Sequence, residues 1–245
     1  MGELQRALLP RVLPQIAGLE AAVSYEPSGR AGGDLYDFFS LDESDNDPGD
    51  AEAAPSRWCV FIGDATGHGL AAAVVMAIVQ SVLHAHPIGI VGPANLLVHA
   101  NRQLCRKNIH GFVTAFLGIY EPLSRRLTYV NAGHPPPLLR RWPDAGVLAL
   151  NAVASYPLGI DASETFKEAS VQIEPGDTVL LYTDGITEAS GAQGELFGQD
   201  RLTSVMCIGG DRPVELIERL RAAVRAHERG QTPKDDQTLV AARVL

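Results

Sequence analysis

The sequence predicts an α+β fold, a sandwich with mainly antiparallel sheets. Short apolar runs typical of strands are numerous, and several follow one another without a helix between them. Stretches expected to form helices occur instead as adjacent pairs, one in the first half of the chain and one near its end. This order is typical of helices packed on antiparallel sheets, not of regular βαβ winding.

In the first half of the chain we expect a short amphipathic helix at residues 3–9, stopped by Pro10. Strands are predicted at 19–25, 33–40 and 58–62. The helix predicted at 70–83 is unusually apolar, so we expect it to be buried on nearly all sides. A second helix, at 93–107, has Pro93 in its first turn and basic residues in its last.

In the second half, strands are predicted at 113–120, 127–131, 137–141, 171–173 and 178–182. Two helices, at 199–207 and 213–228, precede a last strand at 238–244. We divide the chain into an N-terminal helix and linker, residues 1–17, and one domain, residues 18–245.

One segment, residues 42–57, differs in composition from the rest. It carries six acids and no base before Arg57, and the acids are Asp42, Glu43, Asp45, Asp47, Asp50 and Glu52. Such a stretch buries too little apolar surface to offset the entropy of ordering it. We therefore predict a flexible acidic insertion between two strands.

Composition excludes several classes of partner. The 245 residues include 29 acids and 20 bases, a net charge of −9, which argues against nucleic acid or an anionic membrane as the main partner. Cys59, Cys105 and Cys207 stand far apart, as expected for reduced thiols in the cytoplasm. No signal peptide is recognisable, and the longest apolar run, 70–79, is too short to span a bilayer. We expect a cytoplasmic protein.

Acidic residues recur at the predicted strand ends, each beside a glycine or a turn-forming residue. They are Asp34, Asp64, Asp184, Asp235 and Asp236, and the neighbouring glycines include Gly33, Gly63 and Gly185. Carboxylates that converge at one edge of a sheet would suit Mg²⁺ or Mn²⁺. A single Asp at a strand end is more often a turn or cap residue, so the spacing alone leaves both interpretations open.

The glycine turns suggest one alternative and two further site residues. Residues 67–72 match G-x-G-x-x-A, but no Asp or Glu occurs between Ala65 and Tyr120 to hold a ribose, so we reject a dinucleotide site. His68 and His134 lie in the turns TGHG and NAGHPP. Either histidine could shape a site or be a satisfied structural residue.

Six motifs occur in an order that resembles a known family. They are LQRALLP, YEPSGRAGGDLYDFF, GDATGHGLAAAVVMA, NAGHPPPLL, LLYTDGITEA and DDQTLVAARV. Together they resemble the PPM-type serine/threonine phosphatases of bacterial partner-switching systems, the SpoIIE/RsbU-like branch of the protein phosphatase 2C fold. The resemblance runs from about residue 4 to the C-terminus. It implies a four-layer α-β-β-α sandwich with two Mn²⁺ or Mg²⁺ ions at one edge.

The resemblance also implies roles for individual residues. Asp64 would bridge both metals, with the Ala65 carbonyl beside it, and Asp184 and Asp235 would complete the shell of the first ion. Asp34 would serve the second ion, and Asp236 stands where eukaryotic relatives have Asn. The implied catalytic residues are Asp34, Asp64 and Asp184. Residues expected to shape the site are Gly33, Thr66, Gly67, His68, Asn131, His134, Gly185 and Asp236.

By the same resemblance, the protein would hydrolyse phosphoserine or phosphothreonine in a protein by a metal-activated water. The implied substrate is a phosphorylated anti-sigma factor antagonist, a STAS-like protein. The alternative is a catalytically weak, phosphatase-like module that binds phosphoprotein. The helix at 3–9 is too short to be stable alone, so we expect it to dock on the helix pair 70–107, on a regulator or on a second copy.

Overall fold

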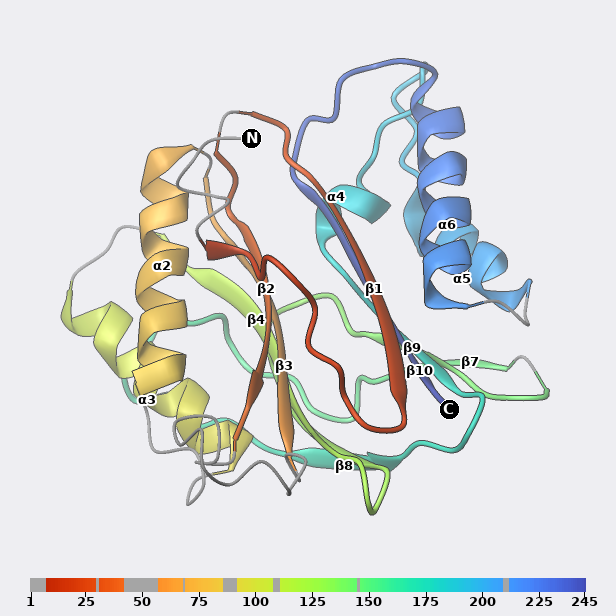
Figure 1. Cartoon of the computed structure of the whole chain (residues 1–245). Helices are drawn as coiled ribbons and strands as arrows, with labels where there is room; N and C mark the ends of the chain where they lie inside the picture. Colours follow the sequence, from red (N-terminus) through yellow and green to blue (C-terminus); the bar gives the residue numbers. More distant parts are fainter. Residues whose placement is uncertain are drawn as a thin grey trace.

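Two five-stranded sheets pack face to face in the computed structural model, and helices cover the outer face of each sheet (Figure 1). Residues 8–29, 31–41, 57–67, 69–85, 92–107, 111–144, 146–208 and 212–245 are described. Every neighbouring pair of strands in both sheets is antiparallel. The predicted α+β fold, a four-layer α-β-β-α sandwich, is therefore confirmed.

The first sheet contains the two ends of the domain. Its strands are, in spatial order, β1 (Leu19–Glu26), β10 (Gln237–Val244), β9 (Thr178–Tyr182), β6 (Leu138–Arg140) and β7 (Val147–Ala149). The helices α5 (Gly198–Cys207) and α6 (Pro213–Glu228) pack on its outer face. Helix α6 turns an apolar stripe, which includes Leu216, Leu220 and Val224, toward β1 and β10.

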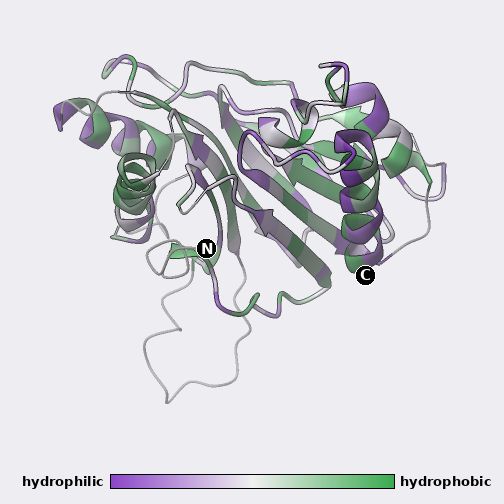
Figure 2. Ribbon diagram, turned by 90° about the horizontal axis from the view of Figure 1, so that it is seen from above, coloured by the Kyte–Doolittle hydropathy of each residue, from purple (hydrophilic) through white to green (hydrophobic). Residues whose placement is uncertain are grey.

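The second sheet is built from the middle of the chain. Its strands are β2 (Asp34–Ser40), β3 (Trp58–Ala65), β4 (Val113–Glu121), β5 (Arg126–Ala132) and β8 (Ala169–Gln172), in that order. The helices α2 (Leu70–Ala85) and α3 (Pro93–Arg106) cover it. Because each sheet is covered on both faces, central strands such as β3, β4 and β9 are buried along most of their length and do not alternate between apolar and polar residues. Figure 2 shows the strands between the two outer groups of helices.

Helix α2 is less buried than the sequence led us to expect. Met76 and Val79 on its inner face are almost completely buried, but Leu70 and Val74 are 67% and 46% exposed. The expectation that this helix is buried on nearly all sides is wrong. The physical reason is its position: α2 belongs to an outer layer, so only one of its faces meets the sheet.

Two short elements lie outside the predicted set, and one strand is longer than predicted. Strand β7 has three residues and helix α4 (Asp184–Thr187) has four. Neither is long enough to show a hydrophobic period. Strand β3 continues to Ala65, so Asp64 lies within the strand and not after it.

The register of the strands determines where the acids lie. Asp34 opens β2 and is paired directly with Asp64 near the end of β3. In the other sheet, β9 ends just before Asp184 and β10 begins just after Asp235 and its neighbour. Because adjacent strands run antiparallel, the end of one meets the start of the next. The four carboxylates therefore come to the same edge of the sandwich.

Several predictions concern segments that are only partly described. Of the helix predicted at 3–9, only residues 8 and 9 are described; the Leu8 carbonyl accepts a hydrogen bond of 2.8 Å from Gln80 Nε2 on α2, and Leu9 is buried. Residues 42–56 of the acidic insertion lie outside the described part, and the Leu41 N–H donates to the Arg57 carbonyl across their ends. The division at residue 18 stays a prediction. No helix among the described residues is long and apolar enough to cross a membrane.

Candidate metal centre

Asp34 is the carboxylate that joins the two sheets. It is 1% exposed, and its Oδ2 accepts hydrogen bonds from Thr183 Oγ1, at 2.7 Å, and Thr238 Oγ1, at 2.5 Å. Both hydroxyls belong to the opposite sheet or its edge. Burial and the charge of Asp64 raise the pKa of Asp34 well above its usual range, and the two threonine hydrogen bonds act against them. Asp34 is thus held in place by the protein itself.

Asp64 lies near several other acids, and burial together with their charges raises its pKa. Burial, followed by the charges of Asp184 and Asp235, raises the pKa of its carboxyl to about 7. Asp34 lies opposite it in the strand register, and a hydrogen bond between the two lowers the pKa of Asp64. Bringing several carboxylates this near to one another is costly unless protons or cations neutralise them. This arrangement is chemically suited to a divalent cation.

Asp184 lies at the N-terminal end of the short helix α4. The next residue, Gly185, lies very close to the backbone of Asp236. Burial, followed by the charges of Glu188 and Asp235, raises the pKa of Asp184. A Cβ atom at Gly185 would overlap the backbone carbonyl oxygen of Asp236. Glycine at position 185 therefore lets the turn after β9 approach the turn before β10.

The two adjacent acids before β10 have different surroundings. Asp236 is buried; its Oδ1 accepts from the backbone N–H of Ser28 at 2.8 Å, and its Oδ2 from that of Gly33 at 2.7 Å. The Ser28 hydroxyl donates to Oδ1 as well. Asp235 is exposed, and its Oδ1 accepts from the Asp236 N–H. Asp236 therefore holds the segment before β2 in place, whereas Asp235 faces the open side of the site.

Gly33 lies against the end of β3. The Ala65 N–H donates to its carbonyl at 3.1 Å, and a Cβ at position 33 would come within 2.6 Å of the Ala65 carbonyl oxygen and 2.9 Å of Asp64 Oδ1. Any side chain here would crowd two of the predicted metal ligands. The close approach explains why glycine precedes Asp34.

The turn after β3 is tied to the start of β4. Thr66 accepts a hydrogen bond from the Phe112 N–H at 2.9 Å through its hydroxyl, which in turn lies 3.2 Å from the Phe112 carbonyl. Gly67 follows with a φ of +90°, a conformation that favours glycine. His68 lies outside the described residues. Thr66 and Gly67 therefore shape the turn beside Asp64.

The NAGHPP turn places a neutral histidine behind the strand of Asp64. Asn131 accepts from the His134 N–H through Oδ1 and donates from Nδ2 to the His134 carbonyl, at 2.8 and 2.9 Å. The imidazole Nδ1 lies 2.9 Å from the hydroxyl of Thr114, which is paired with Asp64. Burial lowers the pKa of His134 to about 3, so the ring is uncharged at neutral pH.

Sequence reasoning missed the hydroxyl residues around the acids. Thr183 and Thr238 bind Asp34, and Tyr25 lies in β1 with a buried hydroxyl that has no hydrogen-bond partner among the described residues. Burial and the charges of Asp236 and Asp34 raise the pKa of Tyr25. The threonines were recognisable only as strand-end neighbours of acids. Nothing in the sequence singles out Tyr25.

The donor set fits a hard cation in chemistry, although its members are not gathered tightly. Its side chains are all carboxylates, the ligands preferred by Mg²⁺ and Mn²⁺. Within the described ranges, no three His, Cys, Asp or Glu side chains are close enough together to hold one ion. Beside Asp235 lies a cavity of about 270 Å³, whose lining includes Gly185, Glu188 and Lys234.

A family model described as Stage II sporulation protein E (SpoIIE) matches residues 54–245, more than half of the chain. The chain belongs to the SpoIIE family. Within that family it is similar to the phosphoserine phosphatase RsbU of Bacillus subtilis (strain 168), at 28% identity over 195 residues, 79% of this chain and 54% of RsbU. It is also similar to the protein IcfG of Synechocystis sp., at 25% identity over 268 residues, 98% of this chain and 40% of IcfG. The chain thus spans about half or less of these relatives.

Solved structures agree with this SpoIIE-family assignment. The RsbU and RsbW domains of Rv1364c from Mycobacterium tuberculosis match with a TM-score of 0.72 and 26% identity, over 93% of this chain and 60% of that one. The SiaA-PP2C domain of Pseudomonas aeruginosa matches with a TM-score of 0.77 and 19% identity, over 92% and 86% of the two chains. RsbX in complex with magnesium matches with a TM-score of 0.68 and 14% identity, over 95% and 98%. The last two establish the fold alone.

Proposed function

We propose that this chain is a metal-dependent protein phosphatase that hydrolyses phosphoserine or phosphothreonine with water. The observation that carries the proposal is that Asp34, Asp64, Asp184 and Asp235 all lie at one edge of the sandwich. Two of these acids come from each sheet, so the complete set exists only in the folded chain. Similarity to named phosphoserine phosphatases supports the same activity.

Two divalent cations, Mn²⁺ or Mg²⁺, would be held by oxygen atoms of this edge. Asp64 would serve both ions, Asp184 and Asp235 would hold the first, and the Ala65 carbonyl and Asp34 would hold the second. Asp236 is left out of this set because both of its oxygens accept hydrogen bonds from the segment before β2.

Such ions, when bound, lower the pKa of water and neutralise phosphoryl oxygens, so that water can replace a protein nucleophile. The chain's own residues orient the ligands. Thr183 and Thr238 fix Asp34 Oδ2, and Gly33 leaves room for the Ala65 carbonyl beside it. Lys234 lines the cavity next to Asp235, where it would partly offset the negative charge met by an approaching phosphate.

The substrate that we propose is a phosphorylated anti-sigma factor antagonist of the STAS type, in a partner-switching pathway. Similarity to RsbU and RsbP and to a chain that carries RsbU and RsbW domains supports this choice. The three cysteines are free, which supports a cytoplasmic setting. A regulator or a second copy acting through residues 1–17 stays part of the proposal.

The test is phosphate release from p-nitrophenyl phosphate and from a phosphoserine peptide, with millimolar Mn²⁺ and with EDTA. Wild type should be active only with the metal. Asp184→Asn should lower kcat/KM by about 100-fold or more, whereas Asp200→Asn, an exposed acid on α5, should have no effect. An inactive wild type, or full activity of Asp184→Asn, would refute the proposal.

A second candidate function is phosphoprotein binding with little turnover. The observation that favours it is that the carboxylates of the described residues are not gathered into a group that could hold an ion. Single-turnover measurements distinguish the two. Metal binding by calorimetry without phosphate release at excess enzyme would establish a binding module, and a burst of phosphate would establish an enzyme.

A further inference from the structure

The distribution of charge along the chain is strongly uneven. The protein carries a net charge of −9, yet no Asp or Glu occurs between Ala65 and Tyr120. This stretch includes α2 and α3, the helices that cover the second sheet, and most of strand β4 of that sheet. Its three bases, Arg102, Arg106 and Lys107, are all at the C-terminal end of α3 or directly after it.

These three cations are exposed and have no acidic partner among the described residues. Arg102 and Arg106 are four residues apart and so share one face of α3, an arrangement of like charges that destabilises a helix. The helix dipole favours cations in the last turn but does not extend to Arg102. By contrast, Arg221 and Arg225 on α6 both pair with Glu26, at 3.2 and 3.1 Å.

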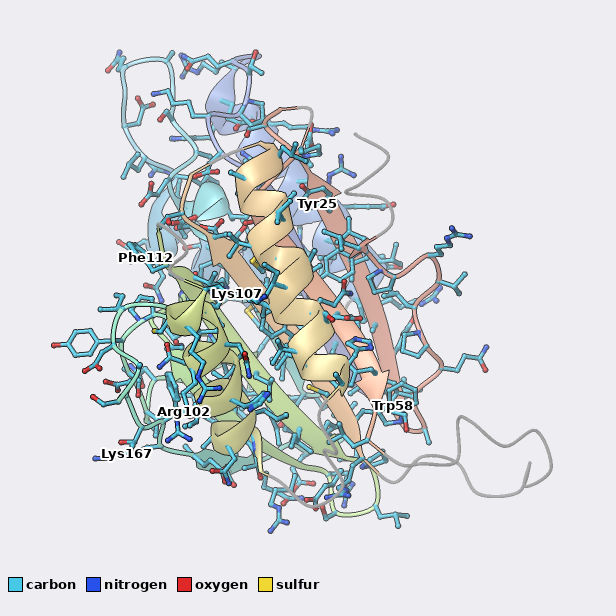
Figure 3. The ribbon with its side chains drawn as sticks, turned by 90° about the vertical axis from the view of Figure 1, so that its left-hand side faces the viewer. Tyr25, Trp58, Arg102, Lys107, Phe112 and Lys167 are labelled. Atoms are coloured by element: carbon cyan, nitrogen blue, oxygen red, sulfur yellow. The ribbon has the colours of Figure 1, made fainter. Side chains whose placement is uncertain are left out.

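Phe112, five residues after Lys107 in the chain, lies at the rim of the candidate metal centre. Phe112 follows α3 in the chain, is 40% exposed, and is bonded through its backbone to Thr66, two residues after Asp64. Figure 3 shows Phe112, Lys107 and Arg102 along the α3 side of the molecule. An exposed aromatic ring on the same side of the molecule as exposed arginines is typical of a surface that binds a protein partner.

None of the acids described near this surface forms an ion pair with its cations. Asp161 lies in the loop that packs along α3, but its carboxylate accepts from the N–H and hydroxyl of Ser163. Glu168 accepts from the Ala94 N–H, at the opposite end of α3. The electrostatic range at physiological ionic strength is about 8 Å, so local charges decide which partner approaches, not the net charge of the chain.

We propose that Arg102, Arg106, Lys107 and Phe112, hereafter the α3 surface, dock an acidic segment of the phosphoprotein substrate beside the phosphorylated residue. The inference rests on the proposed function. It adds that the substrate carries acidic residues beside the phosphorylated one. Free guanidinium and ammonium groups meet carboxylates of the partner, and Phe112 covers an apolar residue between them. The docking surface is separate from the carboxylates that would bind metal.

The experiment compares two synthetic phosphoserine peptides of equal length, one with glutamates and one with glutamines on both sides of the phosphoserine. The full chain with Mn²⁺ should hydrolyse the acidic peptide with about tenfold higher kcat/KM at low salt, and less so at high salt. Reversing the charges in Arg102→Glu/Arg106→Glu should remove this preference through KM. The matched control, Arg11→Glu/Arg229→Glu, changes two exposed arginines elsewhere for which no ion pair is described, and it should keep the preference.

p-Nitrophenyl phosphate separates failure of this inference from failure of the proposed function. If neither that compound nor either peptide is hydrolysed, the proposed function itself is wrong. If the compound is hydrolysed but the peptides are cleaved equally, or Arg102→Glu/Arg106→Glu keeps the preference, the α3 surface does not dock the substrate.

Discussion

Asp235 and Asp236 are chemically identical neighbours that the fold places in opposite environments. Asp236 is buried and accepts from Ser28 and Gly33, so its charge is used to hold the segment before β2. Asp235 is exposed at the cavity beside Asp184. At the scale of single residues, burial and hydrogen-bond partners give Asp236 a structural role and leave Asp235 exposed.

We expect Asp235→Asn to impair catalysis and Asp236→Asn to impair stability. Asp235→Asn should lower Mn²⁺-dependent kcat/KM by about 10–100-fold, with the thermal midpoint in EDTA nearly unchanged. Asp236→Asn should lower the free energy of unfolding by about 1–3 kcal/mol, because its amide cannot accept at both positions. Phosphatase assays and denaturant unfolding in EDTA measure the two effects. The reverse pattern would make Asp236 the metal ligand.

Gly185 offers a second prediction at this scale. In Gly185→Ala the new methyl group would overlap the Asp236 carbonyl oxygen, so the turns before β10 and after β9 must separate. We expect a loss of about 1–3 kcal/mol in the free energy of unfolding and weaker Mn²⁺ binding. The control is Gly146→Ala, where no atom lies within 4 Å of the added methyl. Equal effects of the two substitutions would contradict the close approach.

At the scale of elements, one buried acid attaches helix α2 to strand β2. Asp37 Oδ2 accepts from Gln80 Nε2 at 2.7 Å and lies 2.8 Å from His84 Nε2, and Oδ1 accepts from the Phe38 N–H. Gln80 also donates to the Leu8 carbonyl. The same small cluster therefore joins α2, β2 and the described end of the N-terminal segment.

Removing this attachment should be costly. Asp37→Ala leaves Gln80 and His84 without their common acceptor and should lower the free energy of unfolding by about 2–4 kcal/mol. His84→Ala should cost less than about 1 kcal/mol, because its side chain is half exposed. Denaturant unfolding of both variants and of the double variant gives the coupling. Strict additivity of the two losses would show that the Asp37–His84 contact contributes nothing.

At the scale of the whole molecule, the two sheets bring like charges together at one edge. Asp34 and Asp64 belong to one sheet and Asp184 and Asp235 to the other, and the pKa of Asp64 rises to about 7 because of burial and its acidic neighbours. A folded-state pKa above the unfolded value means that the folded chain binds the proton more tightly. Stability from this source is present at low pH and is lost as pH rises.

In EDTA, the free energy of unfolding should therefore fall by up to a few kcal/mol between about pH 4 and pH 7. Mn²⁺ should restore it at pH 7–8 by replacing the proton as the neutralising charge. Asp64→Asn should flatten the pH dependence and exceed wild type in stability at pH 8 without metal. Thermal unfolding across this range checks the prediction, and parallel curves for the two proteins would contradict it.

The amino-acid sequence alone predicts the class of the fold, which the structure confirms, and the acids of the candidate site. The apolar runs that begin near Trp58 and Thr178 predict strands. A strand that is buried on both faces needs apolar residues at nearly every position, and such a run can be recognised in a short stretch of sequence. The motifs around Asp34, Asp64 and Asp184 predict the candidate site because each acid follows or precedes a strand within a few residues. Both kinds of signal are contained in short stretches of chain.

Contacts between residues far apart in the chain are visible only in the folded structure. Thr183 and Thr238 reach Asp34 across about 150 and 200 positions of sequence, and no local pattern records such a contact. The partly exposed face of α2 and the structural role of Asp236 likewise depend on what lies opposite each side chain. Burial and electrostatic cost are properties of neighbours in space, so they become defined only when the two sheets have packed.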